Sequence, residues 1–178
     1  ARIPAQMEIF VERIHQTPKR IRIFMLLQLV SASRHADLHN ARISNVWELD
    51  GDWLAIRLFL PIWKSDQRGK LFAAKVIAWP KQLWDALVST WKEKAAYKEV
   101  HNALENVVTP HDLRRLALNT IEDPQEALIL SCHATAIRET RAYRQYVAPS
   151  LNDAISQTQI KLSKHLWETF RTCRMMRN

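Results

Sequence analysis

The residues of this chain best suited to chemistry lie in three short segments of its second half. Thr109–Arg115 places His111 three residues before Arg114, and His133 and then Tyr143 follow along the chain. A tyrosine phenol is a poor nucleophile near neutral pH, because its ordinary pKa is about 10. Cations that hold an attacked phosphate would assist it. The order of these residues therefore predicts phosphoryl transfer on a phosphodiester such as DNA, with Tyr143 as the nucleophile.

The elements that must position these residues are predicted to be helices around one small sheet. Only two glycines occur, and apolar residues recur at helical spacing, which favours helices. Asp50-Gly51 is a hairpin signal between alternating apolar runs. We expect strands at 46–49, 53–63 and 71–79. We expect helices at 4–16, 20–33, 36–42, 81–97, 110–121, 124–132, 137–147 and 150–175.

Several helix starts carry local signals. Thr109-Pro110 and Asp123-Pro124 each place a capping side chain before a proline suited to the first helical position. Ser150, with Asp153 three residues later, resembles a capping box. The segment at 20–33 is apolar almost all round, which predicts a buried central helix.

The last predicted helix carries one apolar stripe, whose members are Leu151, Ile155, Leu162, Leu166 and Phe170. Such a stripe can pack on its own domain or on a neighbouring protomer, and both arrangements stay open.

Composition limits the classes of protein that fit. The chain has 178 residues and 47% hydrophobic residues, enough for one domain with a genuine core. Its formal net charge of +8 points to a polyanionic partner. Cys132 and Cys173 have neither metal-site nor disulfide spacing, which fits a reducing compartment. We find no signal peptide, no membrane-length apolar run and no glycine-rich phosphate loop.

Together these segments resemble the catalytic domain of the tyrosine recombinases, the phage-integrase family, from about Glu8 to the C-terminus. Family members carry an arginine followed three residues later by an acidic residue and then leucine. In this chain Arg34, Asp37 and Leu38 match that pattern. A family lysine lies in a β-hairpin, often as Lys-Thr/Ser-Asp-Gln, and Lys64–Gln67 matches this pattern.

The remaining family motifs follow in the expected order. The His-x-Leu-Arg-Arg motif is His111–Arg115, and the Thr-x-x-Tyr motif is Thr140–Tyr143. The Gly-His-Ser motif corresponds to Cys132-His133-Ala134, so this chain has cysteine and alanine where glycine and serine are usual. Ala32-Ser33 also stands where a glycine commonly precedes the first arginine. These departures suggest a divergent branch, such as a mobile-element recombinase.

The resemblance implies a distinct role for each residue. Two always-charged guanidiniums would hold the non-bridging oxygens of the phosphate, and one histidine would donate a further hydrogen bond. A lysine would protonate the departing 5′ oxygen, the other histidine would act as base or proton carrier, and the tyrosine would link to the 3′ phosphate. The two guanidiniums are those of Arg34 and Arg114, and the histidine that donates the hydrogen bond is His133. The lysine is Lys64, the histidine that acts as base or proton carrier is His111, and the tyrosine is Tyr143. No metal and no cofactor is implied.

Other interpretations of single residues stay open. Tyr146 lies three residues after Tyr143 on the same helical face and is an alternative nucleophile, as Lys70 is an alternative to Lys64. Arg34 could interact only with a helix dipole, Lys64 could be a solvated charge, and His133 could be a core histidine. His35 and His39 have zinc-ligand spacing, without a third ligand nearby. The tryptophans are expected to pack in the core or on the sheet rather than stack on bases.

The resemblance also implies a fold, partners and a location. The fold is α+β, mainly α, with a small three-stranded antiparallel sheet, and residues 1–178 form one catalytic domain without the family's N-terminal core-binding domain. The partner is double-stranded DNA, bound by a homotetramer in which the helix at 150–175 docks on the next subunit. No membrane and no small-molecule cofactor is expected. The protein would act in the cytoplasm or nucleoid of a prokaryotic host, or in the nucleus if it comes from a eukaryotic mobile element.

Two other functions fit parts of this pattern. A type IB topoisomerase or hairpin-forming resolvase would share the chemistry, but type IB topoisomerases usually have lysine at the position of His111. A domesticated DNA-binding module that no longer cuts would be expected to lack the tyrosine or an arginine, and Arg34, Arg114 and Tyr143 are all present.

Overall fold

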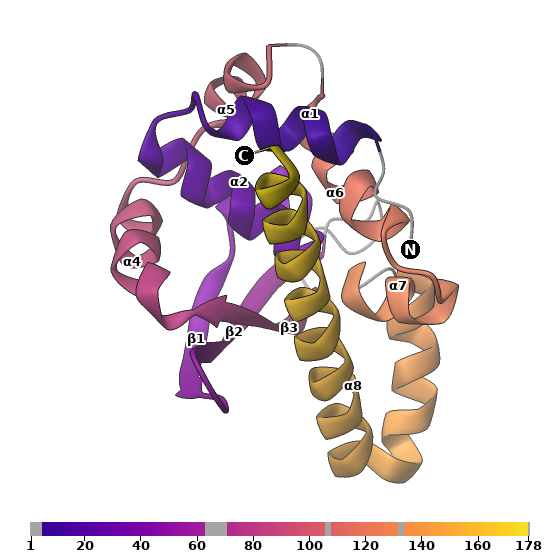
Figure 1. Ribbon diagram of the computed structural model, residues 1–178. Coiled ribbons are helices and arrows are strands. Elements are labelled where there is room, and N and C mark those ends of the chain that lie inside the picture. The colour runs from indigo at the N-terminus through magenta and orange to yellow at the C-terminus, as the bar shows by residue number, and fades with distance from the viewer. Residues whose placement is uncertain (1–4, 63–70, 106–107, 132–133, 178) are drawn as a thin grey trace.

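The computed structural model describes residues 5–62, 71–105, 108–131 and 134–177, and within these it leaves out the side chains of 61–62, 71–73, 134–152 and 175–177 (Figure 1). The described chain is mainly helical and has one small sheet, as predicted. Its helices are α1 (Ala5–Ile14), α2 (Lys19–Ser31), α3 (His35–His39), η1 (Lys81–Leu83), α4 (Trp84–Lys92), α5 (Tyr97–Ala103), α6 (Pro110–Asn119), α7 (Pro124–Ser131) and α8 (Ala134–Arg177). Its strands are β1 (Arg42–Glu48), β2 (Trp53–Ile62) and β3 (Leu71–Pro80).

The three strands form an antiparallel sheet in the order β1-β2-β3. Gly51 has a φ of 74° in the turn between β1 and β2, a conformation that glycine adopts without strain. β2 and β3 match the predicted strands closely. β1 begins earlier than predicted, at Arg42, and its register with β2 shifts between Ile43 and Asn45.

The predicted helix at 81–97 is wrong in its extent. The structure divides this region into η1, α4 and the separate α5, with a link at 93–96. In that link the Lys94 ammonium donates hydrogen bonds to the carbonyl oxygens of His39 and Ala41, at 2.9 and 2.8 Å. These non-local contacts hold the link against the end of α3.

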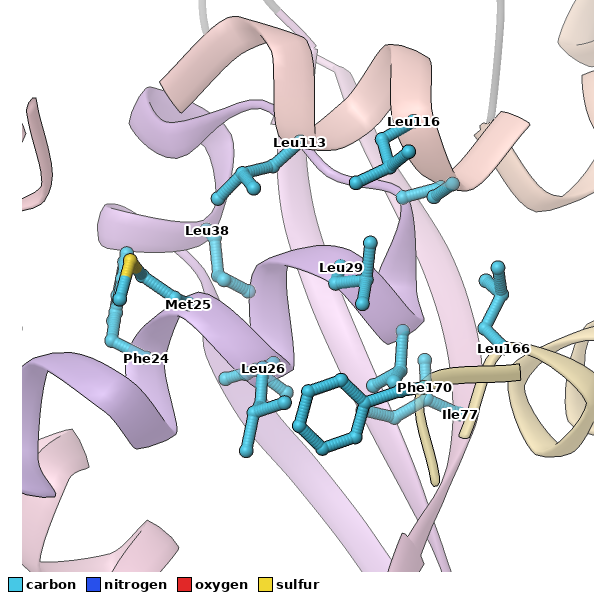
Figure 2. Packing of buried hydrophobic residues seen from close by; sticks show 14 of the residues in the cluster. Phe24, Met25, Leu26, Leu29, Leu38, Ile77, Leu113, Leu116, Leu166 and Phe170 are labelled. Atoms are coloured by element: carbon cyan, nitrogen blue, oxygen red, sulfur yellow. The ribbon is translucent and has the colours of Figure 1, made fainter. Parts of the chain in front are cut away.

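The core is built around α2, whose residues from Ile23 to Ser31 are all buried. Figure 2 shows side chains of α2 packed against Leu113 and Leu116 of α6, Ile77 of β3 and Phe170 of α8. Burying a large apolar side chain contributes about 1.5–3 kcal/mol. The buried central helix predicted at 20–33 is therefore confirmed.

One long element, α8, replaces the two helices predicted at 137–147 and 150–175, so Ser150 does not begin a helix. In Figure 1 its ribbon turns back on itself, and the later arm runs beside β3 and up to α1. Leu162, Leu166 and Phe170 of the predicted apolar stripe are buried in the main core. These three residues of the stripe therefore pack within their own chain.

The later arm of α8 also covers the outer edge of β3. Val76 N–H donates to Gln159 Oε1 at 2.9 Å, and Ala78 N–H donates to Ser163 Oγ at 3.1 Å. The Trp167 indole N–H donates to the Ala78 carbonyl oxygen at 3.1 Å. These three side chains recur every four residues and satisfy backbone groups that an edge strand otherwise leaves unpaired.

Candidate functional site

The link between α2 and α3 positions Arg34. Ala32 ends α2 with a φ of 48°, and Ser33 N–H donates back to the Gln28 carbonyl oxygen at 3.2 Å. This left-handed residue is usually glycine at a helix end, since a Cβ is strained there. The turn therefore forms here with alanine at this position. Arg34 precedes α3 in an extended conformation, and its side chain is 49% exposed.

The start of α6 positions His111 and Arg114. Thr109 Oγ1 accepts from Asp112 N–H at 3.3 Å, and the Asp112 carboxylate accepts from Thr109 N–H at 2.9 Å, which is the capping arrangement expected there. Gln28 Nε2 of α2 donates to the Pro110 carbonyl oxygen at 2.7 Å and ties the two helices together. His111 is exposed, whereas Arg114, one turn later, is 8% exposed.

Asp37 of α3 lies at the centre of a group of cations. Its carboxylate oxygen lies 4.0 Å from the Arg34 guanidinium. Burial raises the pKa of Asp37, while the positive charges of Arg34, Arg114 and Lys75 act to lower it. The charges of Arg34 and Arg114, far apart in the sequence, thus both act on the Asp37 carboxylate. Three cations and one anion leave an excess of positive charge.

Lys75 of β3 is the deepest of these cations and is fully buried. Its ammonium donates to the Ser31 carbonyl oxygen at 2.6 Å and to Ser33 Oγ at 3.2 Å. Both acceptors lie in the few residues before Arg34. Lys75 therefore links the sheet to the turn that carries this arginine. We call Arg34, Asp37, Lys75 and Arg114 the arginine cluster.

The arginine cluster can hold a phosphate by the exposed part of Arg34, while the buried charges set its field. A guanidinium stays charged at all relevant pH values and can grip two oxygens at once. Because α6 places His111 one turn before Arg114, a proton-transfer group stands at the same end of that helix. The arrangement thus offers exposed positive charge that an anion such as phosphate can pair with, and a histidine on the same helix as Arg114.

The remaining predicted site residues are less fully described. Lys64 and His133, like the alternative Lys70, lie outside the described residues. The backbone of Tyr143 and of Tyr146 lies in α8. The geometry thus brings together two of the six predicted catalytic residues, Arg34 and Arg114, and places His111 on the helix of one of them.

Sequence reasoning did not assign Lys75 to the site. A signal was present, because Lys75 stands in phase with Ile77 and Trp79, which both face the main core. A lysine at an inward position of an apolar strand indicates a buried charge that needs partners. In the sequence Asp37 is recognisable only as part of the Arg-x-x-Asp-Leu pattern, and its interaction with the charges of Arg34, Arg114 and Lys75 was not predicted.

His35 and His39 belong to a packing arrangement. The His35 ring packs on Phe24 with 5.2 Å between ring centroids, and its Nε2 lies 2.8 Å from the Ala95 carbonyl oxygen, as a donor to it. Burial lowers the pKa of His35, which favours the neutral ring. Within the described part of the chain, no group of three or more histidine, cysteine or acidic side chains could hold a metal ion.

The described tryptophans mostly pack, as expected. Trp79 is buried, and Trp53, Trp84 and Trp91 pack against the main core. Trp47 packs on the smaller cluster on the other face of the sheet. Trp63 lies outside the described residues.

Comparison of this chain with protein-family models, with curated proteins and with solved structures gave no match in any of the three. No helix in the described ranges is both long and apolar enough to cross a bilayer.

Proposed function

We propose that this chain is the catalytic domain of a site-specific DNA recombinase that cuts and rejoins strands through a covalent 3′-phosphotyrosine. The carrying observation is that Arg34, 4.0 Å from the Asp37 carboxylate, and the buried Arg114 both act with their positive charge on that carboxylate. The two arginines come from the link after α2 and from α6, and a phosphate needs positive charges of this kind gathered from different parts of the chain. The motif order along the sequence supports the same reaction.

The reaction needs a nucleophile, a proton acceptor and a proton donor around this cluster. The phenolic oxygen of Tyr143 attacks phosphorus and forms the new ester bond, while the bond from phosphorus to the 5′ oxygen breaks. The phenol proton passes to His111, and Lys64 gives a proton to the leaving oxygen. Arg34 and Arg114 stabilise the charge that builds on the non-bridging oxygens. Reversal by a new 5′ hydroxyl rejoins the strand, because the ester keeps the energy of the broken bond.

The decisive test is trapping on a nicked suicide DNA duplex that loses the short 5′ fragment after cleavage. The wild-type chain, joined to any DNA-binding domain it naturally carries, is expected to form a protein–DNA adduct that survives denaturing electrophoresis. Tyr143→Phe should abolish the adduct and Tyr146→Phe should retain it. If Tyr143→Phe still forms the adduct and Tyr146→Phe does not, the nucleophile is Tyr146.

A matched pair of arginine variants tests the cluster itself. Arg114→Gln removes one preorganised donor and should slow adduct formation about 10²–10³-fold. Arg115→Gln removes the same charge from an exposed neighbour, whose guanidinium lies 3.7 Å from Asp112, and should have little effect. Equal rates for the two variants would contradict a catalytic role for Arg114. DNA binding by wild type without any adduct would instead support a module that no longer cuts.

A further inference from the structure

A second group of cations surrounds a pocket at the other end of α2. The pocket has a volume of about 320 Å³, and residues of α1, α2, η1 and the end of α8 line it. Lys19 and Arg22 of α2 and Arg171 and Arg174 of α8 contribute to its wall, and no carboxylate does. We call these four residues and the space between them the basic pocket. Its volume is within the range of ligand sites, about 300–1,000 Å³.

The basic pocket is separate from the arginine cluster. Lys19 is the first residue of α2, and Arg34 follows the last, so the length of α2, about 20 Å, lies between them. Neither Arg34 nor Arg114 lines the pocket. A ligand held there would therefore be distinct from a phosphate held at Arg34.

The four cations have no acidic partner in the described part of the chain, where none of the ion pairs includes them. Instead, aromatic rings hold the two arginines of α8. The Arg171 guanidinium lies 5.1 Å from the ring centroid of Trp53 and 5.6 Å from that of Trp167. The Arg174 guanidinium lies 5.8 Å from that of Phe170. Stacking on a ring fixes a guanidinium while its N–H groups remain able to bind an anion.

The floor of the pocket is apolar and increases the effect of these charges. Ile23, Leu26, Trp167 and Phe170 line it and are all buried. Like charges beside a surface of low polarity repel one another more strongly than they do in open water. An anion among them would relieve this repulsion and bind more strongly for the same reason.

We propose that the basic pocket binds the phosphate groups of a polyphosphate ligand or of a polynucleotide backbone. Phosphate suits this wall better than a single carboxylate, because its several oxygens match the paired donors of two arginines. Two further cations suit a ligand that carries more than one negative charge. The pocket needs no cleavage chemistry, so it can be tested whether or not the chain cuts DNA.

The test uses inorganic tripolyphosphate and a short DNA duplex as separate probes, each titrated by calorimetry at low and at physiological salt. The pocket variant is Arg22→Gln combined with Arg171→Gln. The control variant is Lys92→Gln combined with Lys98→Gln, which removes the same charge from exposed positions of α4 and α5. Unfolding curves establish whether each variant is folded. If the double pocket variant does not fold, the single substitution Arg22→Lys is used in its place.

We expect the pocket variant to bind at least one probe about 10–100-fold more weakly, because each lost charged hydrogen bond is worth roughly that factor. The control should bind as wild type does, apart from the general salt effect. Loss of tripolyphosphate binding identifies a small polyphosphate as a sufficient ligand, and loss confined to the duplex identifies the polynucleotide. Equal affinities in the pocket and control variants, or no binding of either probe by wild type, would overturn the assignment.

Discussion

Replacing Lys75 by methionine separates the positioning of Arg34 from the stability of the fold. The wild-type ammonium is fully buried and donates to the Ser31 carbonyl oxygen at 2.6 Å and to Ser33 Oγ at 3.2 Å. Each hydrogen bond from a charged donor is worth about 1.5–3 kcal/mol. Against this, burying an ammonium carries a penalty of several kcal/mol, which methionine of similar length removes. The two effects oppose each other, so the free energy of unfolding should change by about 2 kcal/mol or less.

The catalytic effect of the same change should be much larger. Without the lysine, the turn at Ser31–Ser33 loses its link to β3, and Arg34 is free to move relative to Arg114. A displacement of about 1 Å at a reacting centre lowers a rate about 100-fold. Because the arginines would act on the transition state, DNA affinity should change little while the rate of adduct formation falls.

The assay compares Lys75→Met with Lys81→Met, which removes an exposed lysine 3.7 Å from Glu48. Adduct formation on the suicide duplex, DNA affinity and urea unfolding are measured for both. A folded Lys75→Met chain that forms adduct at the wild-type rate would refute the positioning role. A large loss of stability, with cleavage reduced only in proportion to the unfolded fraction, would show that Lys75 is structural alone.

Two predictions concern the elements around the site. Gln159→Leu removes the acceptor of Val76 N–H at the edge of β3 and should destabilise the fold by about 1–3 kcal/mol in urea unfolding. The control Lys161→Leu removes only an exposed ion pair with Glu126 and should cost about 1 kcal/mol or less. Thr109→Ala removes the cap of α6 and should cost about 1–2 kcal/mol. The hydrogen bonds from Thr109 also lower the pKa of Asp112 below its usual 3.8, so their contribution is present above pH 3.8 and is lost as pH falls through the lower folded value. Thr109→Ala keeps the backbone N–H bond to Asp112, the larger cause, and removes only the hydroxyl bond. The difference in stability between wild type and Thr109→Ala should therefore shrink in part towards low pH, and a constant difference would contradict a contribution from the hydroxyl to Asp112.

Local signals in the sequence predicted the elements whose ends depend on neighbouring residues. The Thr109-Pro110 and Asp123-Pro124 pairs begin α6 and α7 as expected, since a cap and a first-turn proline act within a few residues. The alternating apolar residues after Gly51 correctly predicted the strands β2 and β3. The same reasoning identified α2, because its apolar residues cover the whole helix.

The sequence did not predict features that depend on distant contacts. The division at 93–96 rests on Lys94 reaching the carbonyl groups at the end of α3. The continuation of β1 back to Arg42 rests on pairing with Phe59 in β2, because Ile43 is the one apolar residue among the first four of β1. Capping signals at Ser150 could not reveal that α8 continues through that position.

The site shows the same division between local and distant causes. Motif spacing was sufficient to select Arg34 and Arg114, since each lies in a recognisable segment. Their joint action on Asp37 depends on tertiary packing such as that of α6 on α2, and the role of Lys75 depends on β3 carrying its side chain to the turn after α2. No pattern within a few residues specifies such a meeting, because it is set by tertiary packing.

The arginine cluster is difficult to explain by stability alone. A buried ion pair or network is often no more stabilising than apolar residues of the same volume, since each charge loses its hydration. The positions of Asp37 and Lys75 would therefore suit apolar side chains if packing were their only task. What the charges provide is a fixed field around Arg34, whose own side chain stays half exposed and able to reach a ligand. The Asp37 carboxylate lies 4.0 Å from this accessible guanidinium, and the buried Lys75 ammonium holds the turn that precedes it, so that the cation is kept in place as binding and transferring a phosphate requires.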